Sequence, residues 1–245
     1  MTATASPTFQ RSAAPQTRIK ICGLTREADV DAAVAAGADA IGFVRYAPSP
    51  RCVSAERAAE LIRRLPPFVA SVLLYVNEAA INIVADCAIT AATHLQFHGD
   101  ESPETCRSIA QAAGRPWLRA ARIPTTSAAS FDLVEFARNH AGAQGILLDA
   151  LVEGYGGGGK RFDWSHLPPN VPAHLVLSGG LTPANVSAGI AALRGRGLSL
   201  AVDVSSGVEA DGPDGQALKG IKDADKIHRF VAAVRAADAA TPFLP

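Results

Sequence analysis

The stretch RIKICGLTREADVDAAVAAGADAIGFV, residues 18–44, contains a complete strand–helix–strand unit. RIKIC and AIGFV are short runs of β-branched and aliphatic residues, as expected of buried strands. The segment READVDAAVAAG between them is rich in alanine and has the apolar spacing of a helix. Two strands joined through a helix are typical of a parallel sheet, because parallel strands need a long crossover connection.

The same unit recurs along the chain until eight strands are counted. The later strands are SVLLYV, THLQF, WLRAARI, GILLD, HLVLSG and LAVDV, and segments of helical period lie between them. Ser102 followed by Pro103 predicts one helix start, and Gly37 and Gly114 predict two helix ends. Eight such units are typical of an α/β (β/α)₈ TIM barrel, whereas a doubly wound open sheet ordinarily has fewer strands. We therefore predict a single barrel domain over residues 18–245.

The N-terminal residues 1–17, MTATASPTFQRSAAPQT, differ from the rest of the chain in composition. They are rich in Ala, Ser, Thr and Pro and contain no acidic residue. Such a segment buries too little apolar surface to hold a structure, so we predict a short disordered tail. With Arg11 as its one charge and little amphipathic pattern, it is a poor match to an organelle transit peptide.

The overall composition limits the partners and the compartment. Lys+Arg and Asp+Glu both number 23, so no excess charge favours a nucleic-acid or membrane partner. No apolar run approaches the roughly 18 residues that a membrane-spanning helix needs. The four cysteines are irregularly spaced without a C-x-x-C pair, which argues against structural zinc and disulfides and favours the reducing cytoplasm. We expect a cytoplasmic monomer that binds a small molecule.

Several strands are followed by residues suited to chemistry, and barrel active sites lie at the carboxyl ends of the strands. Cys22 ends the first strand just before a glycine, although a buried cysteine equally well fills space. Asp149 ends the strand GILLD, where an acid must be solvated, paired or catalytic. Arg51 lies in a proline-rich loop after the second strand. His98 follows the fourth strand and suits a structural role as well as a ligand-facing one.

Three glycine-rich segments, GGGGK (156–160), SGGLTPANV (178–186) and SSGVE (205–209), follow the last three strands. Without side chains, their backbone N–H groups can surround an anion, and the loops after strands seven and eight commonly hold phosphate in barrels. Tight turns are the alternative explanation for any one of them. Residues 154–160 resemble a nucleotide-binding P-loop, but Arg161 stands where that motif requires Ser or Thr. His94 and His98 share a strand face but have no third partner for a metal site.

Six ordered motifs resemble those of the phosphoribosylanthranilate isomerases, and the likeness runs from about Lys20 to Val231. They are KICGLT, SPR.VS, QFHGDE, LLDA with GGGGK.FDW, LSGGLTPANV, and DVSSGVE followed by G.KD..KI..FV. This resemblance implies a TIM barrel that catalyses an Amadori rearrangement without a cofactor or a metal. The substrate would be N-(5-phosphoribosyl)anthranilate, and the product 1-(2-carboxyphenylamino)-1-deoxyribulose 5-phosphate.

The resemblance also implies a role for individual residues. Cys22 would be the general base and Asp149 the general acid, and Arg51 would face the anthranilate, with His98 and Asp203 lining the pocket. The phosphate would be bound by Gly157, Gly158, Gly159, Gly179, Gly180, Ser205, Ser206 and Gly207. Two positions depart from the family pattern: Gly158 replaces a threonine and Cys52 replaces an aromatic residue. Neither replacement removes the proposed general base or general acid.

Two other functions remain open from the residues. Another phosphosugar barrel enzyme, such as a ribulose-phosphate epimerase, would need metal-binding histidines or a pair of catalytic carboxylates at other strand ends. A non-catalytic sensor of a phosphorylated ligand would keep the glycine loops but lose the chemistry. The presence of both Cys22 and Asp149 argues against a sensor.

Overall fold

Eight parallel strands close into a barrel in the computed structural model, which describes residues 16–125, 131–151 and 162–240. Each strand pairs with the next along the chain, and β1 closes the barrel against β8. This arrangement confirms the predicted (β/α)₈ fold. The strands are β1 Arg18–Cys22, β2 Ala40–Val44, β3 Ala70–Tyr75, β4 His94–Phe97, β5 Trp117–Ile123, β6 Gly145–Ala150, β7 His174–Leu177 and β8 Ser199–Val204.

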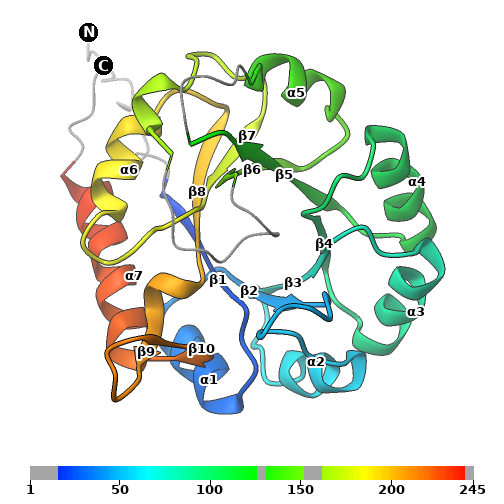
Figure 1. Ribbon diagram of the computed structural model, residues 1–245, viewed down its shortest axis with the longest axis horizontal. Coiled ribbons are helices and arrows are strands. Elements are labelled where there is room, and N and C mark those ends of the chain that lie inside the picture. The colour runs from blue at the N-terminus through cyan, green and yellow to red at the C-terminus, as the bar shows by residue number, and fades with distance from the viewer. Residues whose placement is uncertain (1–15, 126–130, 152–161, 241–245) are drawn as a thin grey trace, which may run out of the picture.

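Helices form a ring around the barrel (Figure 1). They are α1 Glu27–Ala36, α2 Ala55–Ile62, α3 Ala80–Thr90, α4 Pro103–Ala113, α5 Leu133–Asn139, α6 Val186–Leu193 and α7 Ala224–Ala239. The predicted caps are confirmed: the Ser102 side chain accepts from Thr105 N–H, and Gly37 and Gly114 are left-handed. Between Phe162 and β7 only a short 3₁₀ turn forms, η1 Trp164–His166. None of the helices in these ranges is long and apolar enough to cross a membrane.

The side chains of each strand alternate between two environments, as the period of two of a strand requires. In β1, Ile19 and Ile21 belong to the main apolar core, whereas Lys20 and Cys22 line pockets inside the barrel. The interior is only partly apolar. Small clusters of aliphatic side chains alternate there with buried polar residues, among them Lys20, Gln96 and Asp203.

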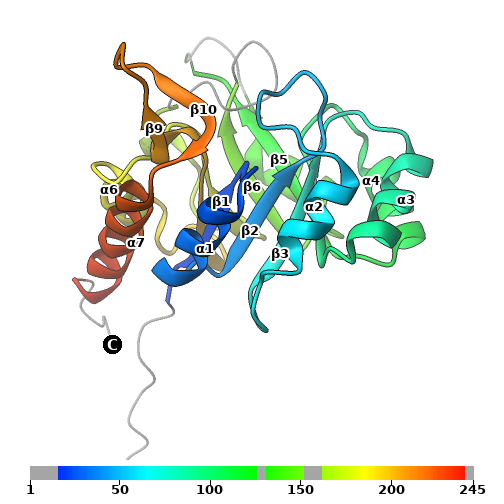
Figure 2. The same ribbon diagram turned by 90° about the horizontal axis from the view of Figure 1, so that it is seen from below.

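A small two-stranded sheet lies between β8 and α7, where the sequence predicted no strands. After the 3₁₀ turn η2 Ser206–Val208, strand β9 Glu209–Asp211 pairs antiparallel with β10 Ala217–Lys222. Figure 2 shows this hairpin above the carboxyl ends of the barrel strands, on the side opposite the start of β1. Pattern analysis missed this hairpin because β9 is short and the residues between the two strands are polar.

The described residues begin at Gln16, before the predicted start of the domain. Thr17, assigned above to the tail, is 2% exposed. Its hydroxyl donates to Asp238 Oδ1 (2.6 Å), and its N–H donates to Asp238 Oδ2 (3.0 Å). Thr17 thus ties the entry of β1 to the end of α7. The rest of the predicted tail, residues 1–15, lies outside the described residues.

Candidate active site

One pocket at the carboxyl ends of the strands brings together the residues predicted to act on a substrate. Its lining includes Cys22 from β1, Asp149 from β6 and Asp203 from β8, together with Arg51 and His98 from the loops after β2 and β4. Of the predicted phosphate-binding residues, the lining also includes Gly179, Gly180, Ser205 and Ser206. The predicted Gly157, Gly158 and Gly159 lie outside the described residues.

Asp149 is held on both of its oxygens. Oδ1 accepts from the N–H of Ala150 (2.9 Å), and Oδ2 lies 3.0 Å from Nε2 of His98. Asp149 and His98 are 6% and 5% exposed, so the carboxylate is largely shielded from bulk water and is held in place by its partners. A Cβ atom at Gly179 would come within 2.8 Å of Oδ1, so only glycine leaves this carboxylate its space.

Cys22 lies in a strongly charged interior. Burial raises the pKa of its thiol, and the ammonium group of Lys20 offsets part of that rise. Lys20 also donates to Asp203 Oδ1 (2.8 Å). Although burial acts to lower the pKa of Lys20, the negative charges of Asp203 and Cys22 outweigh it and hold that pKa above the ordinary lysine value. A permanent cation therefore stands beside the thiol, as expected around a cysteine that must lose its proton.

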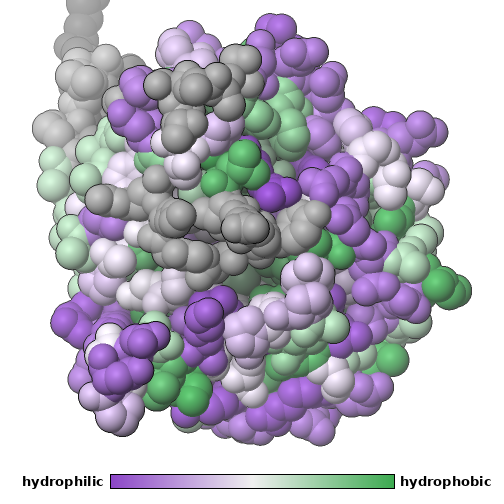
Figure 3. All heavy atoms as spheres, in the orientation of Figure 1, coloured by the Kyte–Doolittle hydropathy of each residue, from purple (hydrophilic) through white to green (hydrophobic). Residues whose placement is uncertain are grey.

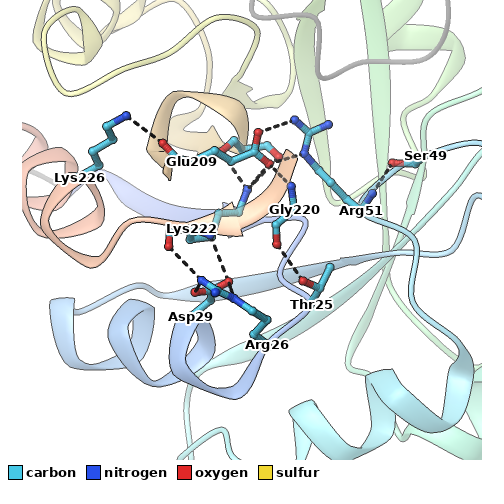
Figure 4. A network of polar contacts seen from close by, with 10 residues as sticks. Thr25, Arg26, Asp29, Ser49, Arg51, Glu209, Gly220, Lys222 and Lys226 are labelled. Atoms are coloured by element: carbon cyan, nitrogen blue, oxygen red, sulfur yellow. Dashed lines mark hydrogen bonds and ion pairs between the residues drawn. The ribbon is translucent and has the colours of Figure 1, made fainter. Parts of the chain in front are cut away.

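Arg51 reaches the pocket from a rigidly held position. Its Nε and Nη2 donate to the two carboxylate oxygens of Glu209, at 2.7 and 2.8 Å. Glu209 also accepts from Lys222 Nζ (3.2 Å) and from Gly220 N–H (2.8 Å). In Figure 4 the Arg51 guanidinium extends toward Glu209 and Lys222 of the β9–β10 hairpin. Nη1, the remaining nitrogen, has no hydrogen-bond partner among the described residues, and Arg51 lines the pocket.

Lys222 links this network to the loop after β8. Its Nζ donates to the backbone oxygen of Ser205 (2.9 Å), while its own N–H donates to Asp29 Oδ2 (3.1 Å). Burial lowers the pKa of Lys222, and Glu209 opposes that shift only in part. The hairpin therefore holds Arg51 and the Ser205 loop in one buried network (Figure 4).

The loop after β7 presents backbone N–H groups to the pocket. Gly179 and Gly180 both have positive φ angles, of 77° and 63°. Asn185 orients this loop: its Nδ2 donates to the carbonyl of Gly180 (2.9 Å), and its Oδ1 accepts from Thr182 N–H (2.9 Å). Among the residues described, the N–H groups of Gly179 and Gly180 have no hydrogen-bond partner. Backbone N–H groups of this kind are the donors of many phosphate sites.

The loop after β8 lies directly against the loop after β7. A Cβ atom at Gly207 would overlap the carbonyl oxygen of Leu181, so glycine is required for the two loops to meet. Gly207 is not among the residues that line the pocket, and its place in the phosphate site stays a prediction.

Sequence reasoning missed four buried polar residues of this site: Lys20, Gln96, Glu209 and Lys222. Two of them had a detectable signal. Lys20 stands two residues before Cys22, and Gln96 two residues before His98, so each pair had to share a strand face. Glu209 and Lys222 had no such signal, because their partnership depends on the hairpin.

The coloured surface toward the edge of this end of the molecule is largely hydrophilic. Figure 3, which views this end of the molecule, shows polar side chains over the β9–β10 hairpin and most of the periphery. Hydrophobic side chains form only small, separate groups among the residues coloured in this view. Such a face suits a charged, water-soluble ligand better than a broad apolar one.

Comparisons with known proteins agree with this architecture. Residues 19–233 match the family model of N-(5′-phosphoribosyl)anthranilate (PRA) isomerase. The N-(5′-phosphoribosyl)anthranilate isomerase of Methylibium petroleiphilum is 58% identical over 224 residues, covering 91% of this chain and 96% of that protein. The enzyme of the same name from Dechloromonas aromatica is 58% identical over 223 residues, covering 91% and 98%.

Solved structures give the same result. The phosphoribosyl anthranilate isomerase of Thermotoga maritima superposes with a TM-score of 0.77 at 38% identity, covering 90% of this chain and 100% of that one. A phosphoribosyl anthranilate isomerase in complex with reduced 1-(o-carboxyphenylamino)-1-deoxyribulose 5-phosphate has a TM-score of 0.74 at 37% identity, with the same coverage. The fold, the ordered motifs and these matches together place this chain in the N-(5′-phosphoribosyl)anthranilate isomerase family.

Proposed function

We propose that this chain converts N-(5-phosphoribosyl)anthranilate into 1-(2-carboxyphenylamino)-1-deoxyribulose 5-phosphate by general acid and base catalysis. The observation that supports this most strongly is the convergence of Cys22, Asp149 and the Gly179–Gly180 loop on one pocket. An acid, a base and a phosphate-binding loop are the three elements that the rearrangement of a phosphosugar requires.

Asp149 is the proposed general acid. Ring opening breaks the bond between C1′ and the ring oxygen, and the leaving oxygen needs a proton. The carboxyl group of Asp149 faces the pocket and delivers that proton, while the anthranilate nitrogen supplies the electron pair that forms the Schiff base. The clamp on both oxygens keeps the carboxyl group aimed at the ligand.

Cys22 is the proposed general base. After ring opening, the C2′ proton is acidic because the protonated Schiff base accepts the electrons released. Cys22 removes that proton as a thiolate, and the resulting enolamine tautomerises to the ketone. Lys20 favours the thiolate by its charge, whereas burial and Asp203 disfavour it by raising the pKa of Cys22. The substrate nitrogen supplies an electron pair in ring opening and, as the protonated Schiff base, accepts electrons in enolisation, so the proposed chemistry needs no metal or cofactor.

Arg51 is the proposed partner of the anthranilate carboxylate. Glu209 occupies Nε and Nη2 and so leaves Nη1 directed at a ligand. Because Glu209, itself bound by Lys222, restrains the guanidinium, little side-chain entropy is lost when the substrate binds. His98 and Asp203 complete the polar lining of the pocket.

The N–H groups of Gly179 and Gly180 and the adjoining Ser205 and Ser206 are the proposed phosphate donors in the described part of the chain. They lie after β7 and β8, where barrels commonly hold phosphate. We also propose that the chain is a monomer. A cytoplasmic location fits the four free cysteines.

A turnover assay tests the proposed function directly. Freshly generated N-(5-phosphoribosyl)anthranilate is fluorescent, and we expect that fluorescence to disappear when the purified protein is added. Inorganic phosphate should compete with the substrate. If the fluorescence decays no faster than without protein, the chain has kept the family fold without the family reaction.

A further inference from the structure

Gln96 lies in the middle of β4, and its side chain is fully buried inside the barrel. Branched apolar residues dominate such interiors, because a buried amide without partners costs free energy. One of the two polar atoms of the amide has a partner, because Nε2 lies 3.0 Å from Nδ1 of His98. The other polar atom, Oε1, has no hydrogen-bond partner in the described ranges. A buried amide that is only half satisfied calls for an explanation beyond packing.

The contact with Gln96 determines which ring nitrogen of His98 has the hydrogen. An amide NH₂ group can only donate, so Nδ1 must accept with its lone pair. A neutral imidazole then has its hydrogen on Nε2, which lies 3.0 Å from Asp149 Oδ2. The opposite tautomer would place two N–H groups against each other and a lone pair against a carboxylate oxygen.

We propose that Gln96 is a positioning residue, which holds His98 in the Nε2–H tautomer and through it fixes the carboxyl group of Asp149. The proposal rests on the proposed function, in which Asp149 gives a proton to the ring oxygen of the substrate. With Oδ2 bound by His98 and Oδ1 bound by Ala150 N–H, the carboxyl group cannot rotate. Each oxygen keeps a second lone pair, and one of these holds the proton that is delivered.

Nitrogen NMR of ¹⁵N-histidine-labelled protein without substrate tests the tautomer, with His98→Gln used to assign the signals. In the wild type we expect a bare Nδ1 and a protonated Nε2. Gln96→Met, which keeps the length and removes both polar atoms, should give a mixture of tautomers. Gln96→Glu, which can only accept when ionised, should favour the imidazolium. Gln144→Met is the matched control, because Gln144 bonds His94 at the opposite end of the barrel.

Kinetics of the same variants complete the test. Gln96→Met should lower kcat by at least about tenfold, the usual effect of losing a partner that orients a site residue. KM should stay within about twofold, because Gln96 does not line the pocket. Gln144→Met should change neither value.

Three results would overturn the proposal: a protonated Nδ1 in the neutral wild-type protein, a Gln96→Met variant with an unchanged tautomer, or one with unchanged kcat. The first remains measurable even when Gln96→Met does not fold. The spectra need no substrate. A protein that did not turn over N-(5-phosphoribosyl)anthranilate would contradict the proposed function, but its spectra would still show the tautomer of His98.

Discussion

Lys20 and Asp203 form an ion pair between β1 and β8 inside the barrel, with Nζ and Oδ1 2.8 Å apart and both side chains 6% exposed. They stand at directly paired positions of the two strands. A Cβ atom at Gly42 of β2 would lie 3.1 Å from Lys20 Nζ and 2.6 Å from Cys22 Sγ. The missing side chain at Gly42 therefore leaves room for the ammonium and the sulfur to come together.

Replacing Lys20 by methionine should make Cys22 less reactive. Burial raises the pKa of the Cys22 thiol and Lys20 lowers it, so without Lys20 that pKa rises further. The thiolate fraction at neutral pH then falls. Alkylation by iodoacetamide, followed by mass spectrometry of the Cys22 peptide, should show a slower rate and a pH profile moved upward.

Lys219→Met is the control for the loss of a positive charge, because Lys219 is exposed. Cys87 and Cys106 report unfolding, since both are buried and should stay unmodified. An unchanged alkylation rate at Cys22 in folded Lys20→Met would mean that Lys20 does not influence the thiol.

Cys22→Ser and Asp149→Asn should impair different steps. A hydroxyl is a much weaker base than a thiolate, so Cys22→Ser should slow proton removal by a factor on the order of 10² to 10⁴. Substrate deuterated at C2′ should then show a substantial isotope effect. In Asp149→Asn ring opening limits the rate, and the isotope effect should be small. If Cys22→Ser keeps more than about a tenth of the wild-type kcat, Cys22 is a packing residue and not the general base.

Glu209→Gln should destabilise the barrel mouth, because it leaves Arg51 and Lys222 buried without their counter-charge. Loss of one partner from a buried ion pair costs about 3–5 kcal/mol of unfolding free energy. Urea unfolding measures this cost. The matched control is Glu60→Gln, whose partner Arg57 lies at the surface, and there the loss should be below about 1 kcal/mol.

The difference between Glu209→Gln and the wild type should depend on pH. Burial acts to raise the pKa of Glu209, but Arg51, Lys222 and Gly220 N–H outweigh it and bring that pKa below the ordinary 4.5. A lowered folded pKa stabilises the protein above 4.5, and this contribution disappears as the pH falls through the folded value. The two unfolding free energies should therefore converge in acid. A constant gap would show that the ionisation of Glu209 is irrelevant to stability.

Gly180→Val should raise KM and weaken inhibition by inorganic phosphate. A β-branched residue rarely adopts the φ of 63° found at Gly180, so the backbone must shift away from the proposed phosphate position. Gly114→Val is the matched control, because Gly114 has φ 61° with open space around it at the end of α4. It bears the same backbone strain far from the pocket and should leave KM unchanged. Equal kinetic effects in the two variants would mean that this loop does not bind the phosphate of the substrate.

A chain that begins at Gln16 should keep full activity, since residues 1–15 contain none of the family motifs. Further removal of Thr17 should lower the melting temperature, because its two hydrogen bonds to Asp238 are lost. Each such bond contributes about 0.5–1.5 kcal/mol. Thermal unfolding of the two truncated chains, with kcat measured for each, separates stability from catalysis. A large loss of activity on removing residues 1–15 alone would show that these residues contribute to function.

The number and type of elements were readable in the sequence, because short-range patterns encode them. RIKIC, AIGFV and GILLD have the composition of buried parallel strands, and the caps at Ser102 and Gly114 are local features of the chain. Eight strand–helix units then left few alternatives to a barrel. Since a barrel places its active site after the strands, the positions of Cys22 and Asp149 followed without any knowledge of distances.

What the tertiary structure alone decided is which polar groups neutralise one another. Glu209 and Arg51 are far apart in the chain, and nothing in either motif predicts that one carboxylate would bind two guanidinium nitrogens and Lys222. The same holds for Lys20 with Asp203. Strand periodicity gives the face on which a side chain lies, but a buried charge is stabilised only by a partner within a few ångströms. That partner comes from another strand, so closure of the barrel and not the local sequence determines it.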